Sequence, residues 1–230
     1  MQQIRRCSHE EEKNSLPSIA ISRNICTPLH PTTKTSHLIQ RKKNDFGKRK
    51  RIYIASKAGQ DEYGRTKVNQ DSFAVLNRIF DNSNYDIIGV FDGHGVNGHK
   101  VSQLISSKVS SFFTNVSNFS STDVTAIYSK LTRHDSHFLT SFITSLQNTL
   151  IYSNFDIHFS GSTFLLLFIL NNRIITTNIG DSRAILISDS SITPLSTDHK
   201  PSLPKEKERI EKQNGLIRKE FSDGPDRVWG

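Results

Sequence analysis

Short apolar runs joined by tight polar turns fill residues 164–195, and this pattern constrains the fold more than any other feature of the sequence. FLLLFIL (164–170), IITTNI (174–179) and AILIS (184–188) each have the length of one strand, and ITPL follows them. The turns NNR, GDSR and DSS between them contain residues that favour chain reversal. The spacing predicts an antiparallel meander, and its continuous apolar character indicates strands that are covered on both faces.

The residues before this meander predict three further strands and two helices. Alternating apolar residues predict strands at 51–59, 72–76 and 86–91. Apolar residues spaced by three and four predict a helix with Asn97 as its N-cap and a second helix that begins near Asp135. The two stripes consist of Val101, Leu104, Ile105, Val109, Phe112, Phe113 and Val116, and of Phe138, Leu139, Phe142, Ile143, Leu146 and Leu150. Both stripes are better explained as core than as part of a cofactor site.

A third, exposed helix is predicted at 204–215, with Pro204 and Glu206 near its start and Lys212 near its end. Together these elements predict an α+β fold. We expect two packed antiparallel β-sheets flanked by helices, which is an α-β-β-α sandwich.

Positive charge is concentrated in the first fifth of the chain. Residues 1–51 carry 12 Lys/Arg and 4 Asp/Glu, whereas residues 52–230 carry 18 of each. The first segment is polar and lacks helical or strand periodicity, so we expect a disordered basic tail at 1–51 and one folded domain at 52–230. The basic run at 41–51 is interpreted as a solvated linker; the alternatives are a nuclear-import signal or an arm that binds nucleic acid or an acidic surface.

Cysteine usage and hydropathy indicate the compartment. Cys7 and Cys26 both lie in the tail, so the predicted domain contains no disulfide, as is typical of a reducing compartment. No apolar run approaches the roughly 20 residues that cross a bilayer, and the start lacks the apolar core of a signal peptide. We expect a monomeric cytoplasmic or nuclear protein without a transmembrane segment.

Four short stretches place an acid or a hydrogen-bond donor beside glycine at the end of a predicted strand. They are VNQDSF (68–73), VFDGHG (90–95), SGSTF (160–164) and IGDSRA (179–184). Each stretch alone is ordinary turn material. The glycines on both sides of His94 have a second interpretation, because glycine also permits close approach of the backbone to a ligand or metal.

The chemistry of these residues suits a hard divalent cation. Asp92 offers a carboxylate, the Gly93 carbonyl lies beside it, and Asp71 could orient water around an ion. His94 titrates near neutrality and could donate a proton to a leaving group. This combination favours hydrolysis by metal-activated water, with a simple turn as the alternative.

The ordered set of motifs resembles a known family. KVNQDSF, VFDGHGVNGH, SGSTFLLLFI, IGDSRAIL and LSTDHKPSLPKEKERIEKQNG, in this order, are similar to the type 2C metal-dependent serine/threonine protein phosphatases, the PPM family. The resemblance spans about residues 52–229. It implies a sandwich of two sheets between helices, two Mg²⁺ or Mn²⁺ ions, and removal of phosphate from phosphoserine and phosphothreonine in phosphoprotein substrates.

The resemblance also implies roles for individual residues. Asp92 matches the carboxylate that bridges the two ions, Gly93 the carbonyl ligand and His94 the general acid. Asp71 matches the acid beside the metal-bound waters. Asp181 matches an acid associated in some members with an additional, weaker ion, although a GDSR turn can also be purely structural.

Departures from the family pattern concern phosphate binding and the end of the chain. Thr66 stands where the family has a phosphate-binding basic residue, so Arg65 and Lys67 become the candidates, and Gln70 replaces a common Glu. The sequence stops at DGPDRVWG, before the two acidic motifs that complete the family's metal site. We therefore expect a partial phosphatase domain, a fragment or truncated product. The alternative is a catalytically inactive phosphatase-like module that binds phosphoproteins or a regulatory partner.

Overall fold

A computed structural model gives the fold of the predicted domain and two short segments of the tail. Most of residues 1–51, including the basic run up to Lys50, and most of the connection between the first two predicted helices lie outside the described residues. The structure describes residues 18–22, 36–40, 51–77, 85–115, 129, 136–170, 173–219, 224 and 226–229.

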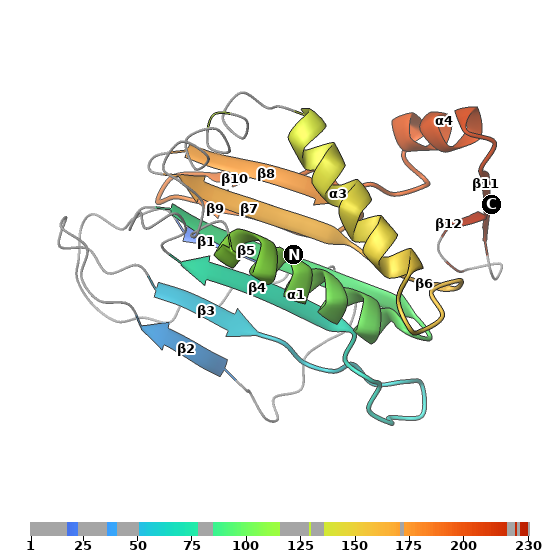
Figure 1. Ribbon diagram of the computed structural model, residues 1–230, viewed down its shortest axis with the longest axis horizontal. Helices are drawn as coiled ribbons and strands as arrows, with labels where there is room; N and C mark the ends of the chain where they lie inside the picture. Colours follow the sequence, from blue (N-terminus) through green and yellow to red (C-terminus); the bar gives the residue numbers. More distant parts are fainter. Residues whose placement is uncertain are drawn as a thin grey trace.

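The largest sheet is antiparallel throughout, with the strand order β4-β5-β7-β8 and with β6 paired to β5 (Figure 1). Its members are β4 (Asp71–Asn77), β5 (Tyr85–Gly95), β6 (Ser160–Ser162), β7 (Phe164–Leu170) and β8 (Arg173–Ile179). These bounds confirm the strands predicted from alternation and from the apolar runs. They also show β5 continuing four residues beyond the predicted end at Phe91.

The predicted meander divides between two sheets. Strand β9 (Arg183–Ile187) pairs with β1 (Ser18–Ser22) and with β10 (Ile192–Pro194), and not with β8. The prediction of one continuous meander is therefore wrong at the turn between β8 and β9. The physical reason is burial: both faces of β7 are apolar, and β9 moves to a second layer where it covers the face that the helices leave open.

Two strands lie within the segment that the sequence predicted to be disordered. β1 adds an edge to β9, and β2 (Ser36–Gln40) pairs with β3 (Arg51–Ala55). The structure thus differs from the prediction in these two short segments. Each segment contains only two or three consecutive apolar residues, and the partner strands β9 and β3 satisfy its backbone hydrogen bonds.

Helices α1 (Gly98–Asn115) and α3 (Ser136–Ile151) cover one face of the main sheet (Figure 1). Their predicted stripes enter a core in which Phe113 packs on Phe168 with ring centroids 5.5 Å apart. The buried members of this core are Ala74, Ile87, Phe91, Val101, Ile105, Val109, Phe113, Phe142, Leu146, Phe164, Leu166, Phe168 and Ile175. None of the helices in the described part of the chain has the length and apolar character of a membrane-spanning helix.

The second sheet packs on the other face of β7. Leu165 and Leu167 point away from the helices and form a second buried cluster with Ala184 of β9. The α+β class and the two packed antiparallel sheets are confirmed. The described residues form three layers, helix, sheet and sheet; the outer helix layer that the sandwich prediction requires is not among them.

The remaining elements are peripheral. Helix α4 (Pro204–Lys212) confirms the third predicted helix and packs on β11 (Leu216–Lys219), which pairs with β12 (Asp226–Trp229). Asn97 occupies the predicted N-cap position of α1, since its carbonyl accepts hydrogen bonds from the backbone amides of Lys100 and Val101.

Replacing Phe168 by alanine tests whether the β7 core carries the stability of the domain. We expect Phe168→Ala to lower the free energy of unfolding by about 3–5 kcal/mol, because the ring is fully buried and the cavity cannot close. The matched control is Phe159→Ala, whose ring is 73% exposed and whose loss should cost about 0.5 kcal/mol or less. Urea denaturation followed by circular dichroism measures both; equal losses would contradict the assignment of the core.

Candidate active site

The DGHG stretch belongs to a strand and does not reverse the chain. β5 runs through Asp92 to Gly95, and its last three residues pair with β6 in the register Gly93 to Ser162, His94 to Gly161 and Gly95 to Ser160. Chain reversal follows at Val96 and Asn97. The turn interpretation of this motif is therefore wrong, and its acid and imidazole lie on a sheet extension.

Two of the predicted metal-binding acids face each other across neighbouring strands. Asp71 begins β4 and is the direct register partner of Asp92 in β5. Directly opposite residues of an antiparallel pair place their Cβ atoms on the same face, about 4.5–5.5 Å apart. The amide of Asp71 donates to the Asn69 side chain, which fixes the start of β4. The structure thus brings Asp71 and Asp92 together, as the sequence predicted.

The glycines of the motif are explained by backbone packing. A Cβ on Gly93 would lie 2.2 Å from the carbonyl oxygen of Gly98, the first residue of α1, and 2.6 Å from that of Gln70. Gly95 has a φ of +83°, and a Cβ there would lie 1.9 Å from the Phe159 carbonyl oxygen. Close approach is the reason for these glycines, as predicted, but the approaching group is the protein's own backbone.

Gln70 ties the two ends of the motif to the strand beside it. Its side-chain amide donates to the Gly95 carbonyl at 2.9 Å, and its backbone carbonyl accepts from the Gly93 amide at 3.1 Å and from the Ser102 hydroxyl at 2.6 Å. A glutamate at this position, ionised at neutral pH, could not donate the first of these bonds. The departure at Gln70 therefore adds a hydrogen bond that holds the motif in place.

The imidazole of His94 lies beside its cross-strand partner Gly161. A Cβ on Gly161 would lie 2.6 Å from the imidazole Nε2, so only glycine leaves room for the ring. Burial lowers the pKa of His94 below its ordinary value of 6.5, and the positive charge of Arg227 lowers it further, while the Asp181 carboxylate opposes both effects. In this structure the imidazole is therefore mainly neutral at pH 7, and its protonated fraction grows as the pH falls.

Asp181 is carried toward His94 by a turn that moves the chain between the two sheets. Gly180 has a φ of +100°, which redirects the chain directly after β8. Ser182, the residue after Asp181, is buried and its Oγ lies 2.7 Å from Thr163 Oγ1. Thr163 in turn contacts Asp92, so the turn and the β5 motif meet at the same end of the two sheets.

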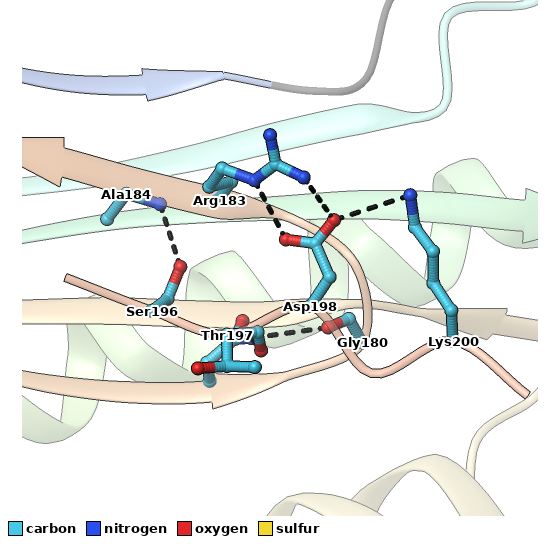
Figure 2. Close-up of polar contacts among 8 residues, drawn as sticks. Gly180, Arg183, Ala184, Ser196, Thr197, Asp198 and Lys200 are labelled. Carbon is cyan, nitrogen blue, oxygen red and sulfur yellow. Dashed lines mark hydrogen bonds and ion pairs between the residues drawn. The ribbon is translucent and has the colours of Figure 1, made fainter. Parts of the chain in front are cut away.

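Arg183 of the GDSR turn is held by an acid that the sequence did not single out. Its Nε and Nη2 atoms donate to the two carboxylate oxygens of Asp198 at 3.0 and 2.7 Å, and Lys200 Nζ lies 3.4 Å from the same carboxylate (Figure 2). The Asp198 side chain is only 9% exposed. The hydrogen bonds from Arg183 lower the pKa of Asp198 against the opposing effect of burial.

Hydrogen bonds join the segment around Asp198 to the turn after β8. Ser196 Oγ accepts from the Ala184 amide at 2.9 Å (Figure 2). The His199 amide donates to the Gly180 carbonyl at 2.9 Å, and the Gly180 amide donates to His199 Nδ1. We call residues 196–200 the strap. It gives Arg183 a structural role, which was the alternative left open for this motif.

The two candidate phosphate-binding residues lie in the loop before β4. Arg65 Nε donates to Asp61 Oδ2 at 2.6 Å and its guanidinium stacks on Tyr63, 5.1 Å from the ring centroid. The Lys67 amide closes the loop by donating to the Gly59 carbonyl at 2.8 Å. The Arg65 side chain is 74% exposed, so the ion pair with Asp61 contributes little stability.

The donor chemistry at the acid pair fits a hard divalent cation, since carboxylate oxygens are the ligands that Mg²⁺ and Mn²⁺ prefer. The number of donors is small. Over the ranges that the structure covers, no group of three or more His, Cys, Asp or Glu side chains is placed to hold a metal ion. Asp71 and Asp92 are thus suitable first ligands that need further oxygen donors.

Sequence reasoning missed Thr163, Asp198 and Arg227. Thr163 lies in the SGSTF stretch, which was singled out only as a whole. Asp198 and Arg183 are 15 positions apart and belong to different turns, so no local pattern connects them. Arg227 in β12 lies near His94 only because the end of the chain folds back toward the site.

Comparison with known proteins places these motifs in context. The family profile described as Protein phosphatase 2C matches residues 60–228. The Arabidopsis thaliana protein named Probable protein phosphatase 2C 72 is 29% identical over 170 residues, which cover 71% of this chain and 51% of the relative. Probable protein phosphatase 2C 52 of Arabidopsis thaliana is 32% identical over 199 residues, which cover 73% of this chain and 42% of the relative.

One solved structure is similar to this chain in its fold. A phosphatase from a pathogenic strain of Toxoplasma gondii is similar with a TM-score of 0.50 and 23% sequence identity, and the match covers 76% of this chain and 60% of that chain. This likeness concerns the fold alone. The chain spans about half, or less, of the length of the two curated relatives described above.

Adding one methyl group at Gly93 tests the packing of α1 on β5. We expect Gly93→Ala to destabilise the protein by about 1–3 kcal/mol, because the contact is with backbone that cannot rotate away. Gly59→Ala is the control, since a Cβ at Gly59 meets no atom within 4 Å. Thermal denaturation compares them, and an equally stable Gly93→Ala protein would contradict the close approach of Gly98.

Replacing Asp198 by asparagine tests the strap through its pH dependence. Because pairing lowers the pKa of Asp198 from 3.8, its stabilisation is present above pH 3.8 and is lost as the pH falls through the folded-state pKa. We expect Asp198→Asn to cost about 2 kcal/mol at pH 7, with the difference from wild type shrinking below pH 3.8. Urea midpoints over this pH range measure the effect. Glu211→Gln, which removes an exposed pair with Lys207, should cost about 0.5 kcal/mol or less at pH 7.

Proposed function

The chain belongs to the protein phosphatase 2C family, and from this membership we propose that the protein hydrolyses phosphoserine and phosphothreonine in proteins with the help of divalent metal ions. The substrates are phosphoproteins. Because the chain spans only part of the length of its curated relatives, this activity is proposed for the protein that contains residues 1–230.

The observation that carries the proposal is the register of β4 on β5. It places Asp71 opposite Asp92 at the end of the sheet, with His94 two residues further along the same strand. Residues i and i+2 of a strand point to the same face, so His94 and Asp92 share one face of β5. An acid pair and an imidazole on one face provide the groups that hydrolysis of a phosphate ester needs.

We propose that Asp92 and Asp71 hold Mg²⁺ or Mn²⁺, with the Gly93 carbonyl and Asp181 as further oxygen donors. When bound, the cation supplies Lewis-acid stabilisation of the phosphoryl oxygens and lowers the pKa of water. The carboxylates contribute negative charge that favours cation binding. This assignment is supported by the cross-strand pairing of the two acids and by the family match over residues 60–228.

We propose that His94 donates a proton to the leaving group from its protonated form, whose fraction grows as the pH falls because the pKa of the imidazole lies below 6.5. In the reaction, a bond forms between phosphorus and a water oxygen, and the bond between phosphorus and the serine or threonine oxygen breaks. The proton from the imidazole neutralises that oxygen and yields the free hydroxyl. The absence of a side chain at Gly161 leaves room for the ring of His94 beside β6.

Arg65 and Lys67 remain the proposed phosphate-binding residues. Both lie in the loop directly before β4, which leads to Asp71. Release of Arg65 from Asp61 would cost little because the arginine is exposed and water can replace the carboxylate as its partner. A guanidinium can then bind phosphate through two parallel hydrogen bonds.

Replacing Asp92 by asparagine tests the proposed reaction. We expect the wild-type protein to dephosphorylate a phosphothreonine peptide in the presence of Mn²⁺, and Asp92→Asn to lower the rate by about 100-fold or more because one negative ligand is lost. A chelator should have a similar effect. Glu208→Gln, an exposed carboxylate on α4, is the matched control and should retain full activity.

Ion binding provides a second measurement on the same proteins. Titration calorimetry with Mn²⁺ should show binding to wild type and to Glu208→Gln, and much weaker binding to Asp92→Asn. Binding of a phosphopeptide without turnover, equal in wild type and Asp92→Asn, would contradict catalysis and identify a non-catalytic binding module.

A further inference from the structure

The hydrogen bonds of the Thr163 side chain join Asp92 to the turn that carries Asp181. It lies between β6 and β7, at the point where β5 exchanges one partner strand for the other. Its side chain is buried, as is that of Ser182.

Thr163 forms two hydrogen bonds with the backbone of Asp92. The Thr163 amide donates to the Asp92 carbonyl at 2.9 Å, and the Asp92 amide donates to Thr163 Oγ1 at 2.9 Å. The second bond uses a side-chain oxygen where a regular ladder would use a carbonyl. The position of Asp92 therefore depends on the rotamer of Thr163.

Ser182, in the turn between β8 and β9, sets that rotamer. Thr163 Oγ1 lies 2.7 Å from Ser182 Oγ, and either hydroxyl can be the donor. The same turn encloses the other side of Thr163, since a Cβ on Gly180 would lie 2.8 Å from the Thr163 Cγ2 methyl. The turn therefore encloses the Thr163 side chain: the Thr163 hydroxyl contacts Ser182, and the Thr163 methyl packs against Gly180.

The turn is itself held by the strap. Bonds between His199 and Gly180, together with the two bonds from Arg183 to Asp198, fix its backbone on both sides of Ser182. A movement of the strap would therefore reach Asp92 through Ser182 and Thr163. We call these two side chains the hydroxyl bridge.

We propose that Thr163 and Ser182 are positioning residues for the phosphatase site: their hydroxyl bridge sets the separation between Asp92 on β5 and Asp181 in the turn that connects β8 to β9. The inference rests on the proposed function for its consequence in catalysis, but its geometry stands on the contacts alone. Loss of either hydroxyl removes the side-chain link between Asp92 and the turn that carries Asp181. Loss of the Thr163 hydroxyl also removes the acceptor of the partly buried hydrogen bond from the Asp92 amide.

The experiment uses four variants of the protein. Thr163→Val keeps the branched shape and removes the hydroxyl, whereas Thr163→Ser keeps the hydroxyl. Ser182→Ala removes the other half of the bridge and leaves Thr163 unchanged. Ser106→Ala is the matched control, because Ser106 Oγ donates to the Phe73 carbonyl at 2.7 Å, a side-chain hydrogen bond of the same kind away from Asp92.

The first measurement is hydrogen exchange of the Asp92 amide by NMR. We expect exchange to be about tenfold faster in Thr163→Val, and also faster in Ser182→Ala although Ser182 does not contact Asp92. Thr163→Ser and Ser106→Ala should exchange as wild type. An effect of Ser182→Ala at Asp92 is what distinguishes a bridge from two independent hydrogen bonds.

The second measurement is Mn²⁺ affinity by calorimetry, with phosphatase activity recorded alongside. We expect affinity to fall about 10- to 100-fold in Thr163→Val and Ser182→Ala, with recovery in Thr163→Ser, as for residues that orient metal ligands. Unchanged exchange of the Asp92 amide in Ser182→Ala would overturn the proposal, as would an equal loss of affinity in Ser106→Ala.

Failure of the proposed function has a different signature. If the wild-type protein has no activity and binds no Mn²⁺, the phosphatase assignment fails while the exchange data still decide whether the bridge exists. If Thr163→Val does not fold, Ser182→Ala supplies the same comparison.

Discussion

Burial of β7 on both faces is the constraint on which the rest of the structure depends. Leu166 and Phe168 point into the helix layer, while Leu165 and Leu167 point into the second sheet, and all four are fully buried. Both apolar faces of a strand must be shielded from water. In this chain α1 and α3 pack against one face of β7, and β9 packs against the other. The three described layers follow from this single requirement.

The candidate site lies where this burial ends. β7 starts at Phe164, and beyond it β5 continues beside the short strand β6. At this end the sheet no longer needs apolar side chains, so β5 can carry Asp92 and His94 without the cost of burying them in a core. The core therefore fixes the backbone of the site, and the end of β7 decides where polar chemistry begins.

Local features of the sequence were predictable, and features that depend on pairing were not. The stripes of α1 and α3 and the apolar run of β7 are visible in a window of residues, because burial repeats with the period of each element. Membership of β9 in a second sheet depends on contacts with Ser18–Ser22, far away in the chain. The proximity of Asp71 and Asp92 was expected from the family resemblance, whereas the link from Arg183 to Asp198 required the structure.

The turn from Gly180 to Ser182 has a consequence for mechanics. It is three residues long and it is the direct connection between β8 in one sheet and β9 in the other. A three-residue connection cannot lengthen, so sliding of one sheet over the other must displace Asp181 at the centre of the turn. Anything that bridges that acid and β5 would then stiffen the sandwich against sliding, so occupancy of the site would be transmitted as rigidity between the layers.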